Sequence, residues 1–365
     1  MSADRPASGE PVPADDAEAL RRTIEEVLLG GGRHWTRHDV VERTGVGPER
    51  TARIWRALGF PLVDDDVRAF TDGDVDALRA GERLIAAGII TEESEAMMAR
   101  ALGHHLSRLA EWQVHTLWAW LNRGRETPLT PAELASSATA LLSEMELLQQ
   151  HVWRRHFAAG AGQVIATEQA GASRKETPGA ALPPDGAVPP GEGLHVQDMA
   201  VGFTDMVGYT RMTRGLDSTE LVKVLDLFES LAWDVVAEGR GRVVKTIGDE
   251  VLFVCESAVT AADIALELTA RAQAEPRLPH VRTGLAHGPV LGRFGDVYGA
   301  AVNIAARLTA VARPDTVLVN TALAGELSGQ DAYELKVLRP VSVRGYSRLR
   351  PVLLRPAAAP RGRSR

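Results

Sequence analysis

The chain has 365 residues, a formal net charge of −7 and a single cysteine, Cys255. One cysteine excludes a disulfide framework within the chain, and the acidic balance gives no sign of a nucleic-acid surface. The length is too great for one ordinary hydrophobic core, so we expect about two domains. The N-terminus lacks the apolar segment of a signal peptide, and no run of about 18 apolar residues is present. We therefore expect a soluble, cytoplasmic protein with no transmembrane segment.

The first 165 residues carry helical patterns throughout. The stretch DVVERTGVGPERTARIWRALGFP, residues 39–61, has the rhythm of helix, glycine turn and helix, and it resembles a helix-turn-helix. The residues that follow resemble the corresponding part of mercury-resistance-type regulators. Residues 1–100 nevertheless contain 20 Asp or Glu against 13 Lys or Arg. DNA binding needs a clustered positive surface. We therefore interpret the motif as a helix-turn-helix fold that does not bind DNA, and we expect no nucleic-acid partner.

Later in this half, residues 91–106, 108–121 and 131–157 repeat apolar residues at spacings of three and four, which predicts amphipathic helices. In the last of these helices, one face gathers Leu134, Leu141, Leu142, Met145 and Leu148. That face suits a seam between two copies of the chain, and it equally suits packing within its own domain.

A change of composition divides the chain. Residues 171–193 hold ten Gly or Pro among 23 positions, which is typical of a linker because such a segment neither pairs as a strand nor buries a face. The sequence therefore predicts a helical domain over residues 1–165, a linker over 166–195 and a second domain over 196–365.

After the linker, short runs rich in β-formers alternate with helical patterns. We predict strands at 199–203, 242–247, 250–254, 281–287, 317–319 and near 333–355, and helices at 219–237, 258–273 and 300–312. Asp217 and Glu220 match a capping box at the start of the first helix. This order, with its tight hairpin, favours an α+β fold with a ferredoxin-like β-α-β-β-α-β core over a doubly wound sheet.

Two aspartates stand where predicted strands end. GFTDMVGYT places Asp205 after the first strand, and VVKTIGDEVLF places Asp249 in the two-residue turn of the hairpin, 44 residues later. Turn chemistry by itself explains each residue. In a ferredoxin-like sheet, however, the first strand and this hairpin are neighbours, so the two carboxylates can meet. Mg²⁺ sites typically have few carboxylate ligands, and phosphate oxygens of the substrate complete the coordination. Two such cations assist phosphoryl transfer.

The two motifs, together with VRTGLAHGPVLGRFGDVYGAAVNIAARL further on, resemble the catalytic core of class III nucleotidyl cyclases over residues 197–355. The resemblance implies that Asp205 and Asp249 bind two divalent cations, Mg²⁺ or Mn²⁺. It also implies that Lys245 and Asp296 read the purine. Adenine offers an N1 acceptor and an N6 donor, which a lysine and a carboxylate complement, so this pair favours ATP over GTP.

The same resemblance assigns roles to residues nearer the C-terminus. Asn303 and Arg307 lie four apart on a predicted helix and match the pair that orients the ribose and stabilises the transition state. Arg344 stands where the family usually presents a lysine to the phosphates. Arginine keeps the positive charge, but its planar guanidinium group replaces the compact ammonium group of lysine as the hydrogen-bond donor.

Around the first aspartate, we expect Phe203, Thr204 and Gly208 to contact the substrate. The backbone that follows, from Met206 to Thr210, can bring amide groups to the polyphosphate, as other glycine-containing turns do for anions.

Taken together, the resemblance implies an adenylate cyclase that forms 3′,5′-cyclic AMP and pyrophosphate from ATP at composite sites of a homodimer. The alternative is a DNA-binding regulator with a degenerate cyclase-like nucleotide-sensing domain. That alternative requires basic clustering and the loss of the metal-binding carboxylates, and the sequence has neither.

The helical half resembles the regulatory domains of soluble actinobacterial-type cyclases. It contains seven of the ten histidines, namely His34, His38, His104, His105, His115, His151 and His156. Histidine changes charge near physiological pH, so we hypothesise that this domain restrains the catalytic dimer and responds to acidification. Scattered surface histidines without a role, or an apolar ligand in the helical core as the regulator, are the alternatives.

Overall fold

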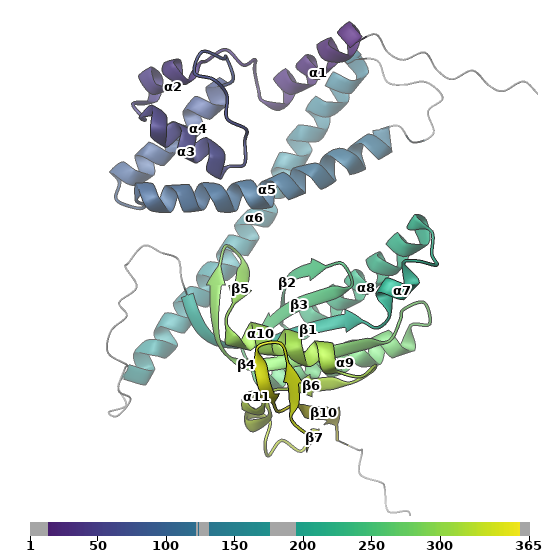
Figure 1. Ribbon diagram of the computed structural model, residues 1–365. Helices are drawn as coiled ribbons and strands as arrows, with labels where there is room; N and C mark the ends of the chain where they lie inside the picture. Colours follow the sequence, from purple (N-terminus) through teal and green to yellow (C-terminus); the bar gives the residue numbers. More distant parts are fainter. Residues whose placement is uncertain (1–13, 122, 124–130, 176–194, 358–365) are drawn as a thin grey trace, which may run out of the picture. The chain divides into compact units, whose positions relative to one another are not determined.

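The computed structural model describes residues 14–121, 123, 131–175 and 195–357 (Figure 1). The chain divides into two compact units, Met1–Glu192 and Gly193–Arg365, which we call the helical unit and the sheet unit. Most of the predicted linker, residues 176–194, lies outside the described residues.

The described part of the helical unit consists of helices. Their bounds are Ala14–Leu28 (α1), Arg37–Thr44 (α2), Pro48–Ala57 (α3), Asp72–Ala86 (α4), Glu92–Leu121 (α5) and Pro131–Lys175 (α6). Local chemistry sets the limits of the predicted helix-turn-helix, α2 and α3. Thr36 and Asp39 form a capping box before α2, and Gly45 ends this helix with a φ of 74°. Pro48 then opens α3 at the position where its missing amide costs nothing.

Two helices are longer than the sequence patterns predicted. Residues 92–121 form the single helix α5, not two helices that meet near residue 107. Helix α6 continues to Lys175, past residue 165, so the first part of the predicted linker is helical. After Pro131 at its start, its sequence is rich in alanine and contains no further proline before Pro178, which explains the extension.

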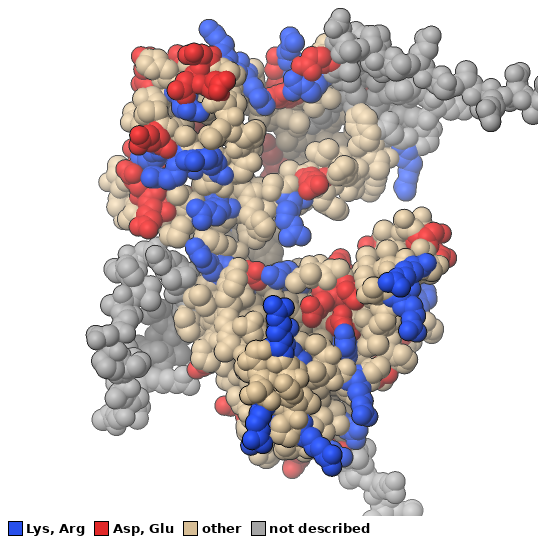
Figure 2. Space-filling model, in the orientation of Figure 1, with Lys and Arg blue, Asp and Glu red and all other residues tan. Residues whose placement is uncertain are grey.

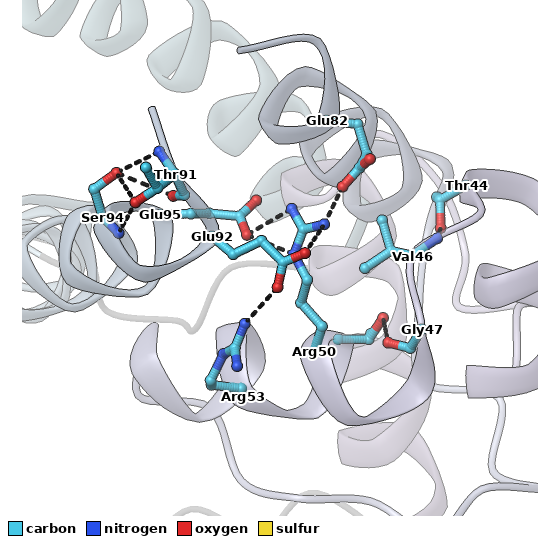
Figure 3. A network of polar contacts seen from close by, with 11 residues as sticks. Thr44, Val46, Gly47, Arg50, Arg53, Glu82, Thr91, Glu92, Ser94 and Glu95 are labelled. Atoms are coloured by element: carbon cyan, nitrogen blue, oxygen red, sulfur yellow. Dashed lines mark hydrogen bonds and ion pairs between the residues drawn. The ribbon is translucent and has the colours of Figure 1, made fainter. Parts of the chain in front are cut away.

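A network of charges joins three helices of this unit (Figure 3). Arg50 of α3 is only 13% exposed and pairs with Glu82 of α4 and with Glu92 and Glu95 of α5. Its Nε donates to Oε2 of Glu95 at 2.8 Å. Arg53, one turn on, pairs with Glu92. The basic residues at the start of α3 are therefore occupied within the unit.

The sheet unit alternates strands and helices. Its strands are His195–Met206 (β1), Arg242–Ile247 (β2), Glu250–Cys255 (β3), Val281–Arg293 (β4), Asp296–Tyr298 (β5), Val317–Val319 (β6), Tyr333–Val337 (β7), Val341–Val343 (β8), Tyr346–Leu349 (β9) and Val352–Pro356 (β10). Its helices are Tyr209–Met212 (α7), Ser218–Glu238 (α8), Ala258–Ala274 (α9), Ala300–Val311 (α10) and Thr321–Glu326 (α11). The short elements α7, β5 and α11 were not predicted, and residues 333–356 form four strands.

The strand order confirms the predicted α+β, ferredoxin-like fold. The main sheet runs β2-β3-β1-β4-β6-β10-β7, with β5 on β4, and β8 and β9 form a separate hairpin. Its first four strands are antiparallel neighbours. The units β1-α8-β2 and β3-α9-β4 are therefore interleaved, which is the β-α-β-β-α-β arrangement. The end of β1 consequently lies beside the β2–β3 hairpin.

Helices cover the sheet on both faces (Figure 1). Helices α8 and α9 bury one face in the largest core, around Phe228, Phe253 and Leu268. Helix α10 packs on the other face, over Val201, Phe203 and Leu252 of β1 and β3. Each such large apolar side chain contributes about 1.5–3 kcal/mol when it is fully buried. The α10 face is the one that carries the candidate site.

Among the described residues, no helix has the length and apolarity that crossing a bilayer requires.

Candidate active site

Asp205 lies near the end of β1, between β3 and β4. In the register of the sheet it is opposite Glu250 of β3 and Arg282 of β4. Strand residues alternate between faces, so Asp205 shares the α10 face with Phe203, two residues earlier. Its side chain is 14% exposed, and its carboxylate is therefore partly removed from water.

The structure brings Asp249 beside Asp205. Gly248 takes the positive φ, 63°, in the two-residue turn between β2 and β3. The Met206 amide donates to the carbonyl oxygen of Asp249 at 3.1 Å, which ties this turn to the end of β1. Burial raises the pKa of the Asp249 carboxyl, and the neighbouring Asp205 carboxylate raises it further. Two partly buried carboxylates at one place favour the binding of a cation.

Two charged residues at this place escaped the sequence analysis. Arg282 donates from Nε to Oδ2 of Asp205 at 2.7 Å, and its Nη2 lies 2.6 Å from the same oxygen. Burial raises the pKa of Glu250 to about 7, and the charges of Asp205 and Asp249 add to the effect. Strand register, and not spacing along the chain, places Arg282. The sequence did offer a signal that Glu250 lies at the site, namely its position directly after Asp249.

Lys245 and Asp296 form an ion pair on the α10 face. Lys245 lies opposite Leu252 in the register of β2 and β3, and its Nζ is 2.5 Å from Oδ2 of Asp296. The Val297 amide donates to Oδ1 of Asp296 at 2.8 Å. Burial would raise the pKa of Asp296, but the bonds from Lys245 and Val297 outweigh it and lower that pKa. Both side chains are partly exposed, at 39% and 25%, so a planar base can reach them.

Helix α10 carries Asn303 and Arg307 one turn apart. Asn303 is exposed, whereas Arg307 is half-buried. In the described part of the chain, the Nε of Arg307 is buried and has no hydrogen-bond partner. An unpaired buried donor costs free energy, so this guanidinium is suited to the oxygen of an anionic ligand.

Arg344 lies in the turn between β8 and β9, where Gly345 has a φ of 87°. Its side chain is exposed, and none of the described residues forms an ion pair with it. The hairpin packs through Val341 and Tyr346 on the core that contains Leu308 of α10. The structure thus places Arg344 on a hairpin that packs against α10, the helix that carries Asn303 and Arg307.

The side chains of Phe203 and Thr204, which the sequence analysis expected to contact the substrate, are 6% and 0% exposed. Phe203 belongs to the core under α10. Thr204 shares a hydrogen bond of 2.9 Å between its hydroxyl oxygen and that of Thr283. The reason is that β1 is a central strand covered on both faces, so that the residues just before Asp205 face packed cores.

The turn after Asp205 is only partly available to a ligand. The amides of Met206 and Val207 donate to the carbonyl oxygens of Asp249 and His280, at 3.1 and 2.7 Å. Those two amides therefore cannot cradle a phosphate as the sequence suggested. Gly208 is exposed and has a φ of 83° where the short helix α7 begins, so the backbone beyond Val207 is the part that a ligand can approach.

The donor atoms fit a hard divalent cation. Carboxylate oxygens are the ligands that Mg²⁺ and Mn²⁺ prefer, and Asp205 and Asp249 present them together. Within the described ranges, no group of three or more His, Cys, Asp or Glu could hold a metal by itself. Cations at this place would therefore need further oxygens from water or substrate, as Mg²⁺ sites with few protein ligands do.

The chain is similar to known nucleotidyl cyclases over most of its length. Residues 194–355 match the adenylate and guanylate cyclase catalytic domain. An adenylate cyclase of Streptomyces coelicolor is 39% identical over 323 residues, which cover 88% of this chain and 78% of that protein. A pH-sensitive adenylate cyclase of Mycobacterium tuberculosis is 28% identical over 339 residues, which cover 90% of this chain and 81% of the relative. Among solved structures, the catalytic core of a rhodopsin-guanylyl cyclase with ATPalphaS is similar, with 19% identity and a TM-score of 0.42, over 45% of this chain and 98% of that one.

The match to the Streptomyces protein is long enough to include most of the helical unit as well as the sheet unit. The similarity therefore extends beyond the catalytic domain itself. This chain belongs to the class III adenylate cyclases of the actinobacterial type.

Proposed function

We propose that this adenylate cyclase forms 3′,5′-cyclic AMP and pyrophosphate from ATP at composite sites of a homodimer. One observation carries the proposal: the Asp205–Asp249 carboxylates, the Lys245–Asp296 pair and helix α10 all lie on one face of the sheet. We place the protein in the cytoplasm, where ATP is abundant and the buried thiol of Cys255 stays reduced.

Substrate recognition would begin with the base. The ammonium group of Lys245 would donate to N1 of adenine, and the carboxylate of Asp296 would accept from the N6 amino group. Asn303 would orient the ribose. The Arg307 guanidinium, whose Nε has no partner in the described residues, would stabilise the charge that develops on the α-phosphate oxygens.

The chemistry would be an in-line displacement at the α-phosphorus. The bond that forms joins the ribose O3′ to that phosphorus, and the bond that breaks releases pyrophosphate with its electron pair. Asp205 and Asp249 would hold two divalent cations, Mg²⁺ or Mn²⁺, which would help to deprotonate the 3′ hydroxyl and neutralise the phosphates. Arg344 would add a positive charge for the phosphates from the β8–β9 hairpin.

A homodimer is supported by the surfaces of the helical unit. Helices α5 and α6 expose large apolar side chains, each about half exposed or more: Leu106, Trp112, Trp120, Leu148, Trp153 and Phe157. Monomeric soluble proteins rarely expose so much apolar surface on neighbouring turns. A second copy of the chain would bury these residues and supply the second half of each catalytic site, in an isologous arrangement.

Regulation through the helical unit is also part of the proposal. His34 lies 3.4 Å from Asp72, and His38 lies 3.2 Å from Glu42, so protonation would strengthen these contacts. The relative in M. tuberculosis is named as pH-sensitive. A comparison of the pH–activity profiles of the whole chain and of residues 196–365 tests this idea, and identical profiles would contradict it.

An apolar ligand is the second candidate regulator. A cavity of about 250 Å³ lies among α3, α4 and α5. Apolar side chains dominate its lining, including Ile54, Leu58, Phe70, Leu84, Ile90 and Met98. Ligand pockets typically combine such a lining with a few polar groups, here Asp74 and Glu95.

The alternative function, a DNA-binding regulator, finds less support. Helix α3 would read the DNA, but Arg50 and Arg53 are already paired with glutamates of α4 and α5. On the face drawn in Figure 2, Lys and Arg alternate with Asp and Glu over the helical unit and do not form a basic field. Binding to phosphates would need such a field.

The direct test is to incubate the full-length protein with ATP and Mg²⁺ or Mn²⁺ and to measure cyclic AMP. We expect cyclic AMP from the wild type and a loss of about 100-fold or more in Asp205→Ala. The control is Asp226→Ala, at an exposed aspartate of α8, which should keep the wild-type rate. Full activity of Asp205→Ala would refute the role of this carboxylate.

A further inference from the structure

We propose that His280 and Asp315 are positioning residues that fix the turn following Asp205. The inference rests on the proposed function, because it matters for catalysis only if Asp205 holds a cation. No contact of either residue with the Lys245–Asp296 pair is present among the described side chains, so we expect an effect on the metal site and not on base recognition.

The turn after Asp205 is attached to the residue that precedes β4. The Val207 amide donates to the carbonyl oxygen of His280 at 2.7 Å, and Met206 lies opposite Val281, the first residue of β4. His280 comes immediately before the strand, where the pairing of β1 with β4 has ended, so a further contact is needed to hold this residue in place. Any movement of His280 would be passed to Val207 and thus to the end of β1.

Asp315 supplies that attachment from the loop between α10 and β6. Its Oδ2 lies 2.7 Å from Nδ1 of His280. Its amide donates to the carbonyl oxygen of Val281 at 2.7 Å. Asp315 therefore holds the start of β4 through its side chain and its backbone at once, on the opposite side from the turn that contains Val207.

The conformation of Asp315 indicates that its side chain is kept for this contact. Its φ is 58°, in the left-handed region where glycine is the most stable residue. Its Oδ1 is buried and has no hydrogen-bond partner among the described residues, which also costs stability. A glycine would remove both costs, so the carboxylate serves a purpose other than the stability of its loop.

The same short segment of β4 extends to the catalytic helix. Arg282 donates from Nη1 to the carbonyl oxygen of Ala310 in the last turn of α10, at 3.2 Å, and from Nε to Asp205 at 2.7 Å. Residues 280–282 thus connect the turn after Asp205 to the helix that carries Arg307. A shift of His280 would displace the carboxylate of Asp205, and small misplacements of catalytic groups cost up to about 100-fold in rate.

Three variants of the full-length chain test the proposal. Asp315→Gly removes the contact with His280 and suits the backbone conformation. Asp315→Asn keeps an oxygen that can accept from Nδ1 and tolerates a positive φ. The control is Arg240→Gly, at another non-glycine residue of positive φ, 61°, between α8 and β2. Each is measured for melting temperature, kcat and KM for ATP, and hydrogen exchange of the Val207 amide.

For Asp315→Gly we expect an unchanged or higher melting temperature, a kcat lower by about tenfold and a KM for ATP within about twofold of wild type. Exchange of the Val207 amide should become faster by about tenfold or more. Asp315→Asn should retain most of kcat, and Arg240→Gly all of it. Wild-type kcat in Asp315→Gly, or an equal loss in Arg240→Gly, would overturn the proposal. Hydrogen exchange needs no catalysis, so unchanged exchange at Val207 would also overturn it even if the proposed function failed.

Discussion

At the scale of single residues, we propose that selection of the base depends on two side chains that neutralise each other. Lys245 Nζ and Asp296 Oδ2 are 2.5 Å apart, so a purine has to open this ion pair and replace it with two hydrogen bonds. Adenine can do so because it offers one acceptor and one donor to the pair. Guanine presents O6 and an N1 proton in their place, which leaves both protein groups mismatched.

We therefore predict that Asp296→Asn narrows the preference for ATP over GTP. The amide still accepts from adenine N6, but it can also donate to guanine O6. The ratio of kcat/KM for the two nucleotides should change by about 10- to 100-fold, as for other bidentate base contacts. The control is Asp263→Asn, since Asp263 accepts from the Tyr333 hydroxyl on another element at 2.6 Å. An unchanged ratio in Asp296→Asn would contradict this role.

At the scale of elements, the close packing of α10 on the sheet sets the position of Asn303 and Arg307. Gly284 of β4 lies directly beneath this helix. A Cβ atom built on Gly284 would lie 2.3 Å from the Thr309 amide nitrogen and 2.4 Å from the Ala305 carbonyl oxygen, both in the helix backbone. No side chain can therefore be accommodated there unless the helix moves.

Gly284→Ala should accordingly harm both stability and activity. Overpacking of a core typically costs about 1–3 kcal/mol of the free energy of unfolding, and the displaced helix would carry Arg307 out of place. Urea unfolding and the rate of cyclic AMP formation measure the two effects. Gly325→Ala in α11 is the matched control, because a Cβ there meets no atom within 4 Å. Wild-type stability in Gly284→Ala would show that the close approach does not matter.

Local patterns in the sequence were sufficient to predict most helices and strands, but they were less able to predict the contacts within the candidate site. The hairpin around Gly248 was predictable because two-residue turns and strand periodicity are local properties. The contact of Arg282 with Asp205 was not, since it depends on the pairing of strands 77 residues apart. The burial of Thr204 was not predictable for the same reason. Alternation along β1 cannot reveal which faces are covered until the positions of α9 and α10 are known.

At the scale of the whole molecule, the helical unit presents an apolar surface that its described residues do not cover. Trp153 and Phe157 of α6 are 59% and 66% exposed, and their rings are 5.4 Å apart. The sequence left open whether α6 is a seam between copies or packs within its unit. On the predicted face itself, Leu148 is exposed, whereas Leu141, Leu142 and Met145 are half-buried. The seam therefore stays a proposal, and it is the exposure of Trp153 and Phe157 that supports it.

Trp153→Glu should therefore weaken the proposed dimer. A tryptophan at the centre of an interface often contributes 2 kcal/mol or more, so we expect the dissociation constant to rise by about 30-fold. Analytical ultracentrifugation measures this change. Trp233→Glu, at an exposed tryptophan of α8, is the matched control and should leave the dimer intact. A dimer as stable as the wild type in Trp153→Glu would exclude this face as the seam.

The central claim is that each active site combines Asp205 of one chain with Arg307 of another, and the mixing of two inactive variants tests it most directly. Asp205→Ala and Arg307→Ala would each be inactive alone. After equal mixing with exchange of subunits, half of the dimers are mixed, and one of the two sites in each keeps every residue. We predict a return to about a quarter of the wild-type rate of cyclic AMP formation. A mixture that stays as inactive as its components, although mixed dimers form, would contradict the composite site.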